Sequence, residues 1–396
     1  MLKKVFEKKS KIMSVLSIIF VFFILRKGNE RYTVDIIFIV TTLLFTFLDK
    51  KYNKISKGLL ISIIGYIFFL SLSFIRTEYM SINSEVFFKI IIHNYILFTC
   101  LSQLELEEKY YKYFIVFFML FSFIVTIKGI EEWSLHDFSP NYRLKSRYGP
   151  TVFTVEVAIY ILISFIYLIY SKTKKEKLLS IITFIISFLV LVGTNSRITL
   201  LTIPFLLIVI IGIKYRKKMK LSYFIIIIII LLSFLKTPYI NKYLYRVKRL
   251  SSIENIMKET RIRIWNKGIL DFKKNNYKAL GFYHYNNVEM GAIPWEKNVH
   301  LHNNLLEILV TQGMLSLIFY ITFNIFLFLE MIKKLKKTNI ESQKIMLYIA
   351  ISILSFLNLS GLTDSNIYFA KVNQLSFFIF ALALCNVKTE DKKEIK

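Results

Sequence analysis

Cysteine is scarce in this sequence, and several features that define common functional classes are missing from it. The 396 residues include two cysteines, Cys100 and Cys385, and both lie in apolar segments. Two such cysteines define neither a disulfide framework nor a metal site. The sequence has no glycine-rich phosphate loop, and its apolar segments carry no ring of carboxylates that would suggest ion coupling. These absences argue against a disulfide scaffold, a P-loop protein and an ion-coupled transporter.

Charge is also missing from several long stretches of the chain. Hydrophobic residues make up 55% of the sequence, and they come in blocks rather than with amphipathic spacing. A helix needs roughly 17–25 apolar residues to cross the hydrocarbon layer, where the backbone must satisfy its own hydrogen bonds. The blocks do not alternate polar and apolar residues, as the strands of a membrane β-barrel would. The blocks with almost no charge are 34–48, 59–74, 113–127, 178–192 and 221–235.

We therefore predict an all-α, polytopic membrane protein with about 12 transmembrane helices. The expected helices are 12–26, 33–48, 58–75, 86–103, 112–130, 151–170, 178–194, 198–213, 221–236, 314–332, 344–361 and 367–386.

Basic residues outnumber acidic ones, 53 to 26, and their positions point to a membrane rather than to nucleic acid. Lysines gather in short segments between the apolar blocks, as they do in cytoplasmic loops. With the N-terminus inside, every second loop is a lysine cluster, except 104–112, where glutamates dilute the charge. Both termini are then expected in the cytoplasm. The lysine-rich segments are 3–11, 50–57, 172–177, 214–220, 333–337 and 388–396.

The longest segment without a transmembrane helix is expected to form one large external loop between helices 9 and 10. We divide the chain into 1–236 with helices 1–9, 237–301 as the external loop, and 302–396 with helices 10–12 and a cytoplasmic tail. Apolar residues at helical spacing over 240–256 predict an amphipathic helix on the membrane surface. A second short helix is expected over 261–274.

The first candidate site lies in the polar turn from Gly193 to Arg197, which joins two apolar helices with almost no linker. An arginine at the outer membrane edge is costly unless it is solvated or paired, so Arg197 is a functional candidate. The alternative is an arginine that only reaches toward lipid headgroups.

The second candidate site is the sequence Thr260-Arg261-Ile262-Arg263-Ile264-Trp265. Two arginines that are two residues apart cannot share one helix face, so one can face a site while the other faces lipid or solvent. An interfacial anchor built on the tryptophan is an equally good interpretation.

The third candidate site is His300-Leu301-His302-Asn303-Asn304, followed by Glu307 and then Gly313. A histidine suits general base chemistry near neutral pH. A His-x-His metal site is an alternative, but the nearby acidic residues do not form a convincing ligand set, so no metal is expected. The simplest alternative is a histidine that caps the following helix.

Together these stretches resemble the O-antigen ligase and polymerase superfamily of bacterial membrane glycosyltransferases. The strongest match is His302-Asn303 followed by Gly313. The sequence departs from the family pattern at Ser316, where glycine is usual, and it lacks the asparagine expected a few residues after Arg147. The resemblance covers residues 140–320. The other matching stretches are Thr194-x-Ser196-Arg197, Arg261-x-x-x-Trp265 with Gly281, and Arg147-x-Gly149.

The resemblance implies an enzyme of the bacterial inner membrane that moves a glycan from undecaprenyl diphosphate to an acceptor hydroxyl on the periplasmic side. It implies no metal, cofactor or nucleotide sugar. Its partners would be the lipid-linked glycan donor, lipid A-core or another glycan acceptor, and membrane lipids. By resemblance, His302 is the general base, and Arg197 and Arg261 bind the diphosphate. The expected supporting residues are Arg147, Arg263, Asn303, His300 and Glu307.

The chemistry of these residue types agrees with this assignment. Arginine stays charged and donates two hydrogen bonds at once to phosphate, so it can stabilise a diphosphate leaving group. An acceptor hydroxyl is a weak nucleophile until a base takes its proton. Direct displacement would invert the anomeric centre.

Two alternatives remain open. A single large external loop favours a ligase over a polysaccharide polymerase of the same superfamily. Two large external loops would have favoured the polymerase, but the segment 131–150 is short. A flippase for lipid-linked glycans would carry many charges along a path within the helices. His93 and Lys89, one helical turn apart in the fourth expected helix, are expected to face the bundle interior or an aqueous cavity, where a proton pathway is an alternative, but one such pair is thin evidence for a transporter.

Overall fold

The computed structural model describes residues 15–17, 40, 55–139, 141–145, 149–215, 259–288 and 300–388. Three expected helices, 12–26, 33–48 and 221–236, lie wholly or almost wholly outside the described residues, and so does the expected amphipathic helix 240–256.

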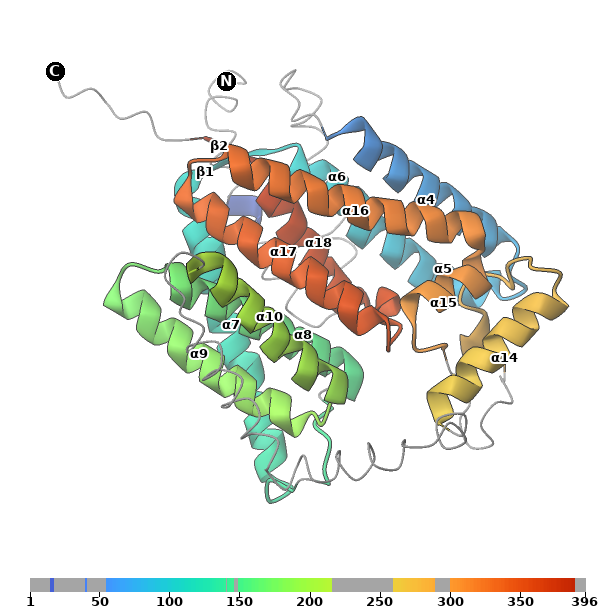
Figure 1. Cartoon of the computed structure of the whole chain (residues 1–396), viewed down its shortest axis with the longest axis horizontal. Helices are drawn as coiled ribbons and strands as arrows, with labels where there is room; N and C mark the ends of the chain where they lie inside the picture. The colour runs from blue at the N-terminus through green and yellow to red at the C-terminus, as the bar shows by residue number, and fades with distance from the viewer. Residues whose placement is uncertain are drawn as a thin grey trace. The chain divides into compact units, whose positions relative to one another are not determined.

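The chain divides into two compact units, and each is built mainly of helices (Figure 1). The first unit comprises Met1–Phe121, Leu315–Leu354 and Ile367–Lys396. Its elements, some of which continue into the second unit, are α4 (Lys57–Ile75), α5 (Met80–Lys89), η1 (Ile90–Ile96), α6 (Leu97–Ser102), β1 (Glu105–Glu107), α7 (Glu108–Ser134), α16 (Met314–Lys337), α17 (Glu341–Gly361), η4 (Asn366–Tyr368), α18 (Ala370–Leu384) and β2 (Asn386–Lys388).

The second unit comprises Ser122–Met314 and Ser355–Asn366. It includes the end of α7, the end of α17 and the segments that carry the candidate site residues. Its own elements are α8 (Pro150–Tyr170), α9 (Lys174–Gly193), α10 (Arg197–Tyr215), α14 (Thr260–Lys274), η3 (His284–Asn286) and α15 (Asn304–Gln312).

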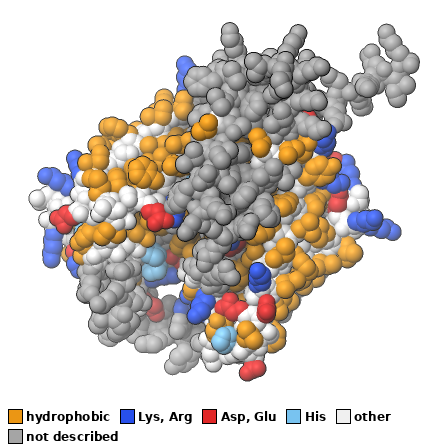
Figure 2. Space-filling view, turned by 180° about the vertical axis from the view of Figure 1, so that it is seen from behind, with side chains coloured by type: hydrophobic (Ala, Val, Ile, Leu, Met, Phe, Trp, Pro, Cys, Tyr) orange, Lys and Arg blue, Asp and Glu red, His pale blue; other side chains and the backbone are white. Residues whose placement is uncertain are grey.

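Within the described residues, eight helical segments are long and apolar enough to cross a membrane. The exposed face of α4 illustrates why lipid is their solvent. Ile61, Ile64 and Phe68 follow one another at helical spacing and are each more than half exposed. Large apolar patches of this kind also cover much of the face shown in Figure 2. A soluble protein rarely exposes such a surface to water, whereas lipid contacts it without cost. The chain is therefore an all-α polytopic membrane protein, as the sequence predicts.

The expected helix 86–103 is part of a longer span, Met80–Ser102, which contains a π-helical stretch. This stretch, η1, packs against α18 and carries the buried His93. Lys89 lies one turn earlier and forms an ion pair with Glu85. The expectation that His93 faces the helix bundle is confirmed. The Lys89 side chain is 28% exposed, and its partner Glu85 stands one helical turn away with the opposite charge.

A short parallel strand pair was not expected from the sequence. Residues 105–107 of β1 pair with 386–388 of β2. The segment 104–112, expected as a loop, therefore contains a strand and the first turn of α7. The last expected helix is also shorter than predicted. Its final carbonyls, at Leu384 and Cys385, accept hydrogen bonds of 2.5 and 2.7 Å from Nζ of Lys334. This cationic cap satisfies carbonyls that the end of a helix leaves unpaired.

In the second unit, α9 packs closely on α8 through small polar side chains. Ser180, Thr183 and Ser187 recur three and four residues apart on α9 and are fully buried. Small side chains of this kind let helix backbones approach closely where lipid supplies no hydrophobic drive. On α8, the buried Glu156 accepts a 2.7 Å hydrogen bond from the Tyr160 hydroxyl.

The expected orientation places the loop after α7 outside the cell and the loop before α9 in the cytoplasm. Leu135 is 78% exposed, and Lys174 is also exposed. In right-side-out spheroplasts, a membrane-impermeant maleimide should label L135C, and it should label K174C only after permeabilisation. The unsubstituted chain is the control, because Cys100 and Cys385 are buried. The opposite labelling pattern would reverse the topology.

Candidate functional site

The loop 300–303 leads into α15, and Asn303 caps that helix. Asn303 has an extended backbone, with φ −159°, and its side-chain oxygen accepts a hydrogen bond from the Leu306 N–H. This is the geometry that helix N-termini favour. The suggestion that a histidine caps the helix is therefore wrong. Gly313 ends the helix with a φ of +94°, a backbone conformation that favours glycine.

His302 has a left-handed backbone, with a φ of +49°. A side chain with a Cβ enters this region at a cost of roughly 1–2 kcal/mol. Such residues persist where the surrounding contacts determine the conformation, and they gather at functional sites. The contacts that hold this loop are therefore part of the site.

The peptide groups of Leu301 anchor the loop from one side. Its N–H donates a 2.7 Å hydrogen bond to the buried carboxylate of Glu307, and its carbonyl accepts a 2.7 Å hydrogen bond from the Trp265 indole. The Leu301 side chain packs against Gly268, where an added Cβ would lie 2.6 Å from it. Trp265 is thus a positioning residue for the histidine loop rather than an interfacial anchor alone.

The turn that follows α17 holds the loop from the other side. The Asn303 amide donates a 2.9 Å hydrogen bond to the Leu362 carbonyl, and the Asn304 amide donates one of 2.5 Å to the Asn366 side chain. Gly361 leaves room for Asn304, because an added Cβ would lie 2.2 Å from its amide nitrogen. Segments 62 residues apart are thereby joined at their backbones and amide side chains.

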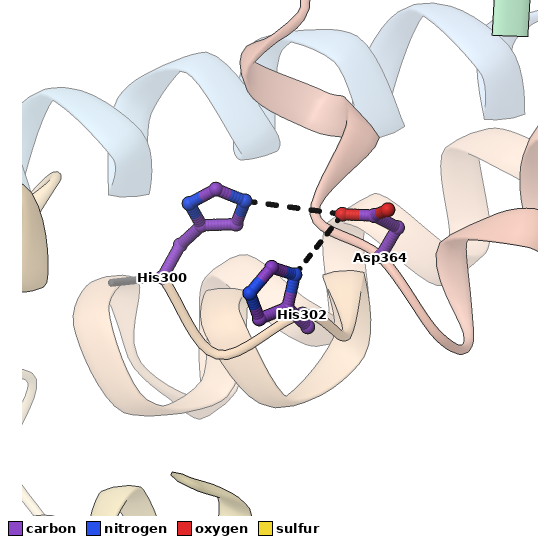
Figure 3. A group of neighbouring side chains, drawn as sticks. All are labelled: His300, His302 and Asp364. Atoms are coloured by element: carbon purple, nitrogen blue, oxygen red, sulfur yellow. Dashed lines mark hydrogen bonds and ion pairs between the residues drawn. The ribbon is translucent and has the colours of Figure 1, made fainter. Parts of the chain in front are cut away.

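Asp364 in that turn brings the two histidines together (Figure 3). Its Oδ1 lies 3.2 Å from Nδ1 of His302 and 3.8 Å from Nε2 of His300. The two imidazole rings are 4.5 Å apart between centroids. Each histidine side chain is 27% exposed, and that of Asp364 is 15% exposed. The cluster is therefore partly shielded and still open to a ligand.

Burial alone would raise the pKa of Asp364, but hydrogen bonds from His300 and His302 outweigh it and hold the pKa well below its usual range. Asp364 is thus a carboxylate at neutral pH, and a carboxylate only accepts hydrogen bonds. Nδ1 of His302 must then carry the proton of this contact. In the neutral ring, Nε2 is left with a lone pair that can accept a proton.

Sequence reasoning missed Asp364. The available signal was its position in the polar sequence Thr363-Asp364-Ser365-Asn366, between two apolar helices. The charge pattern that puts the histidine loop outside puts this turn on the same side. A list of polar residues in outward turns would have included it.

Arg197 is the first residue of α10, and the tight turn expected before it is confirmed. The turn is fixed by the segment 142–144. The Leu144 N–H donates to the Gly193 carbonyl at 3.1 Å, and Nε of Arg143 donates to the Thr194 carbonyl at 3.0 Å. The side chain of Arg197 is exposed. The turn therefore fixes the backbone position from which the Arg197 side chain extends.

The two arginines of α14 lie on different faces of the helix, as expected from their spacing. Arg261 precedes Trp265 by four residues, so the two share a face, and Trp265 contacts the histidine loop. Arg263 lies about 200° around the helix from Arg261. Both side chains are exposed. Arg261 is therefore on the side of α14 that meets the histidine loop.

The structure does not join all the expected site residues by direct contacts. Among the described residues, His302 makes its hydrogen bond with Asp364 and not with Arg197 or Arg261. Arg147 lies outside the described residues. Glu307 is fully buried and holds the Leu301 peptide. His300 and Asn303 are parts of the loop itself.

The described part of the chain is thus a membrane protein with a partly exposed carboxylate–histidine pair, Asp364 and His302, which lies between the start of α15 and the end of α17. Residues 182–321 match the family model described as O-antigen ligase. The match supports the O-antigen ligase superfamily and covers α10, α14 and the histidine loop. No curated protein matches the chain.

The packing at Gly361 gives a test of the clamp between the two segments. Gly361→Ala should push the Asn304 amide away from Asn366 and destabilise the protein by about 1–3 kcal/mol. Thermal unfolding in detergent measures the change. The matched control is Gly212→Ala, where an added Cβ meets nothing within 4 Å. That helical substitution should be neutral or stabilise by up to about 1 kcal/mol. Equal effects of the two substitutions would contradict the clamp.

Proposed function

We propose that the protein is an O-antigen ligase-type glycosyltransferase. It moves a glycan from undecaprenyl diphosphate to an acceptor hydroxyl, on lipid A-core or another surface acceptor, at the periplasmic side of the inner membrane. The observation that carries the proposal is the Asp364–His302 pair, because His302 stands in a strained loop within the segment that matches the O-antigen ligase family.

The proposed reaction is a direct displacement with His302 as general base. Nε2 of His302 takes the proton of the acceptor hydroxyl while the acceptor oxygen bonds to the anomeric carbon. The bond from that carbon to the phosphate oxygen breaks, and undecaprenyl diphosphate leaves with the electron pair. Attack from the opposite face inverts the anomeric centre. Asp364 keeps the proton of His302 on Nδ1 and stabilises the imidazolium that forms, as the aspartate of a catalytic triad does.

Arginine residues would stabilise the leaving group. The negative charge on the diphosphate grows as the glycosidic bond breaks, so preorganised guanidinium groups stabilise the transition state more than the bound donor. We assign this role to Arg197, on the rigid turn before α10, and to Arg261, on the face of α14 that carries Trp265. Arg147 and Arg263 are secondary candidates. The reaction needs neither a metal nor a nucleotide sugar, because the donor already carries a good leaving group.

The pair predicts a specific loss of activity. His302→Ala should lower turnover by about 10²–10⁴-fold, the usual worth of base catalysis. Asp364→Asn should lower it less, because the imidazolium that forms during the reaction loses its anionic partner. Asp364→Glu should restore part of the activity. Purified protein in nanodiscs with undecaprenyl-diphosphate glycan, with and without lipid A-core, provides the assay.

Several outcomes of that assay decide between functions. The exposed His136, in the turn after α7, supplies the control His136→Ala, which should retain full activity. One acceptor-dependent product that His302→Ala abolishes supports the ligase. A product ladder without acceptor would instead establish a polymerase. If no product forms in any lane, the result counts against glycosyl transfer and favours the flippase, and a flipping assay is the next measurement.

The two arginines of α14 give a second test with a built-in comparison. Arg261→Lys should lower turnover by about 10²–10³-fold, as loss of one transition-state donor does, because lysine cannot donate the paired hydrogen bonds. Arg263→Lys, on the opposite face, should have a smaller effect. Initial rates over a range of donor concentrations separate turnover from donor KM. Equal losses in the two variants would contradict the assignment of faces.

A further inference from the structure

Three potential metal ligands converge on one point in the histidine loop. The ligand atoms of His300, His302 and Asp364 all lie within 4.8 Å of one another, and Figure 3 shows both rings directed at the same carboxylate oxygen. The two separations from that oxygen are 3.2 and 3.8 Å. Two imidazole nitrogens and one carboxylate oxygen form a donor set that zinc uses in proteins.

The spacing of these atoms suits a tetrahedral ion. Zinc binds histidine nitrogen and carboxylate oxygen at about 2.0–2.2 Å, so ligand atoms around a tetrahedral zinc lie about 3.3–3.5 Å apart. The two separations from the Asp364 oxygen bracket this value, and the ligand nitrogens of the two histidines lie within 4.8 Å of each other, so binding requires the rings to rotate toward one another. Hydrogen bonds between the Leu301 peptide and the side chains of Trp265 and Glu307 hold the backbone between the two histidines.

We propose that His300, His302 and Asp364 form a binding site for a divalent transition-metal ion, with Zn²⁺ as the best fit. The nitrogen donors favour zinc over magnesium or calcium, which prefer sets made entirely of oxygen. Asp364 supplies the negative charge, and a fourth position stays open toward solvent. The third ligand comes from a turn 62 residues away, which is why the sequence offers no convincing ligand set.

Zinc in this position acts as an inhibitor of the proposed function. A metal on Nδ1 of His302 takes the place of the proton there, and in the neutral ring Nε2 then carries the hydrogen. A protonated Nε2 cannot accept the proton of an acceptor hydroxyl. Metal binding and base catalysis at His302 are therefore mutually exclusive. This consequence rests on the proposed function, whereas the binding site itself does not.

Direct measurement of metal binding tests the site without an activity assay. Full-length protein without a polyhistidine tag is freed of metal with a chelator and titrated with Zn²⁺ against a chromophoric chelator. Co²⁺ serves as a spectroscopic probe of tetrahedral coordination. One equivalent should bind, and the d–d bands of Co²⁺ should be those of a tetrahedral site. His300→Ala and Asp364→Asn should each weaken binding by at least tenfold, and His300→Gln guards against a folding defect in the first variant.

His136→Ala is the matched control, because this histidine is outside the cluster, and its binding should equal that of the unsubstituted protein. Binding that is unchanged in His300→Ala and Asp364→Asn would place the ion elsewhere and overturn the proposal. No saturable binding would overturn it as well. If glycosyl transfer is found, Zn²⁺ should inhibit it and a chelator should reverse the inhibition. Metal binding without any transfer would contradict the proposed function and leave the metal site standing.

Discussion

The two hydrogen bonds to the Leu301 peptide determine the geometry of the whole candidate site. Both are 2.7 Å long, and the one to Glu307 is buried, where a lost partner costs more than the bond contributes when it is made. They fix the residue immediately before His302, whose left-handed backbone would otherwise relax. The contributions of these two bonds, one of them a buried bond to a carboxylate, are large enough to offset the roughly 1–2 kcal/mol cost of that backbone. The direction of the imidazole therefore depends on Trp265 and Glu307, although neither touches it.

The partners of the loop come from segments that are distant in sequence. Trp265 lies 36 residues before Leu301, and Asp364 lies 62 residues after His302. In lipid, helices satisfy their own backbone, so polar side chains that seek partners gather where helices end. The histidine loop lies at the start of α15 and the Asp364 turn at the end of α17, and both ends have free polar groups to exchange. Membrane insertion thus favours polar clusters at helix ends. The hydrogen bonds of Asn303 and Asn304 determine that this loop pairs with the turn after α17.

The parts of the structure that could be predicted are those set by local composition. The apolar blocks predicted the described spans, and the short helix expected over 261–274 corresponds to α14. The chemistry of Asn303 was not assigned, since capping depends on which side chain reaches the next turn. The π-helical stretch of η1 and the ion pair of Lys89 were missed because an apolar window does not separate α from π geometry. Asp364 was missed because no local pattern links a residue to a loop 62 positions away.

The helix α14 connects the proposed base with the proposed phosphate ligand. Its buried face carries Ile264 and Phe272, which share a hydrophobic cluster with Leu301, and Gly268, against which the Leu301 side chain packs. Trp265 holds the loop, and Arg261 stands one turn earlier on the same face. Because one rigid helix carries both Trp265 and Arg261, the loop with the proposed base His302 stays at a constant distance from the start of the Arg261 side chain. A displacement reaction requires such a fixed placement of its base and its leaving-group ligand. The Arg261 side chain is exposed, so its charge can meet a diphosphate, while the carboxylates of Glu307 and Asp364 hold the loop and the histidine.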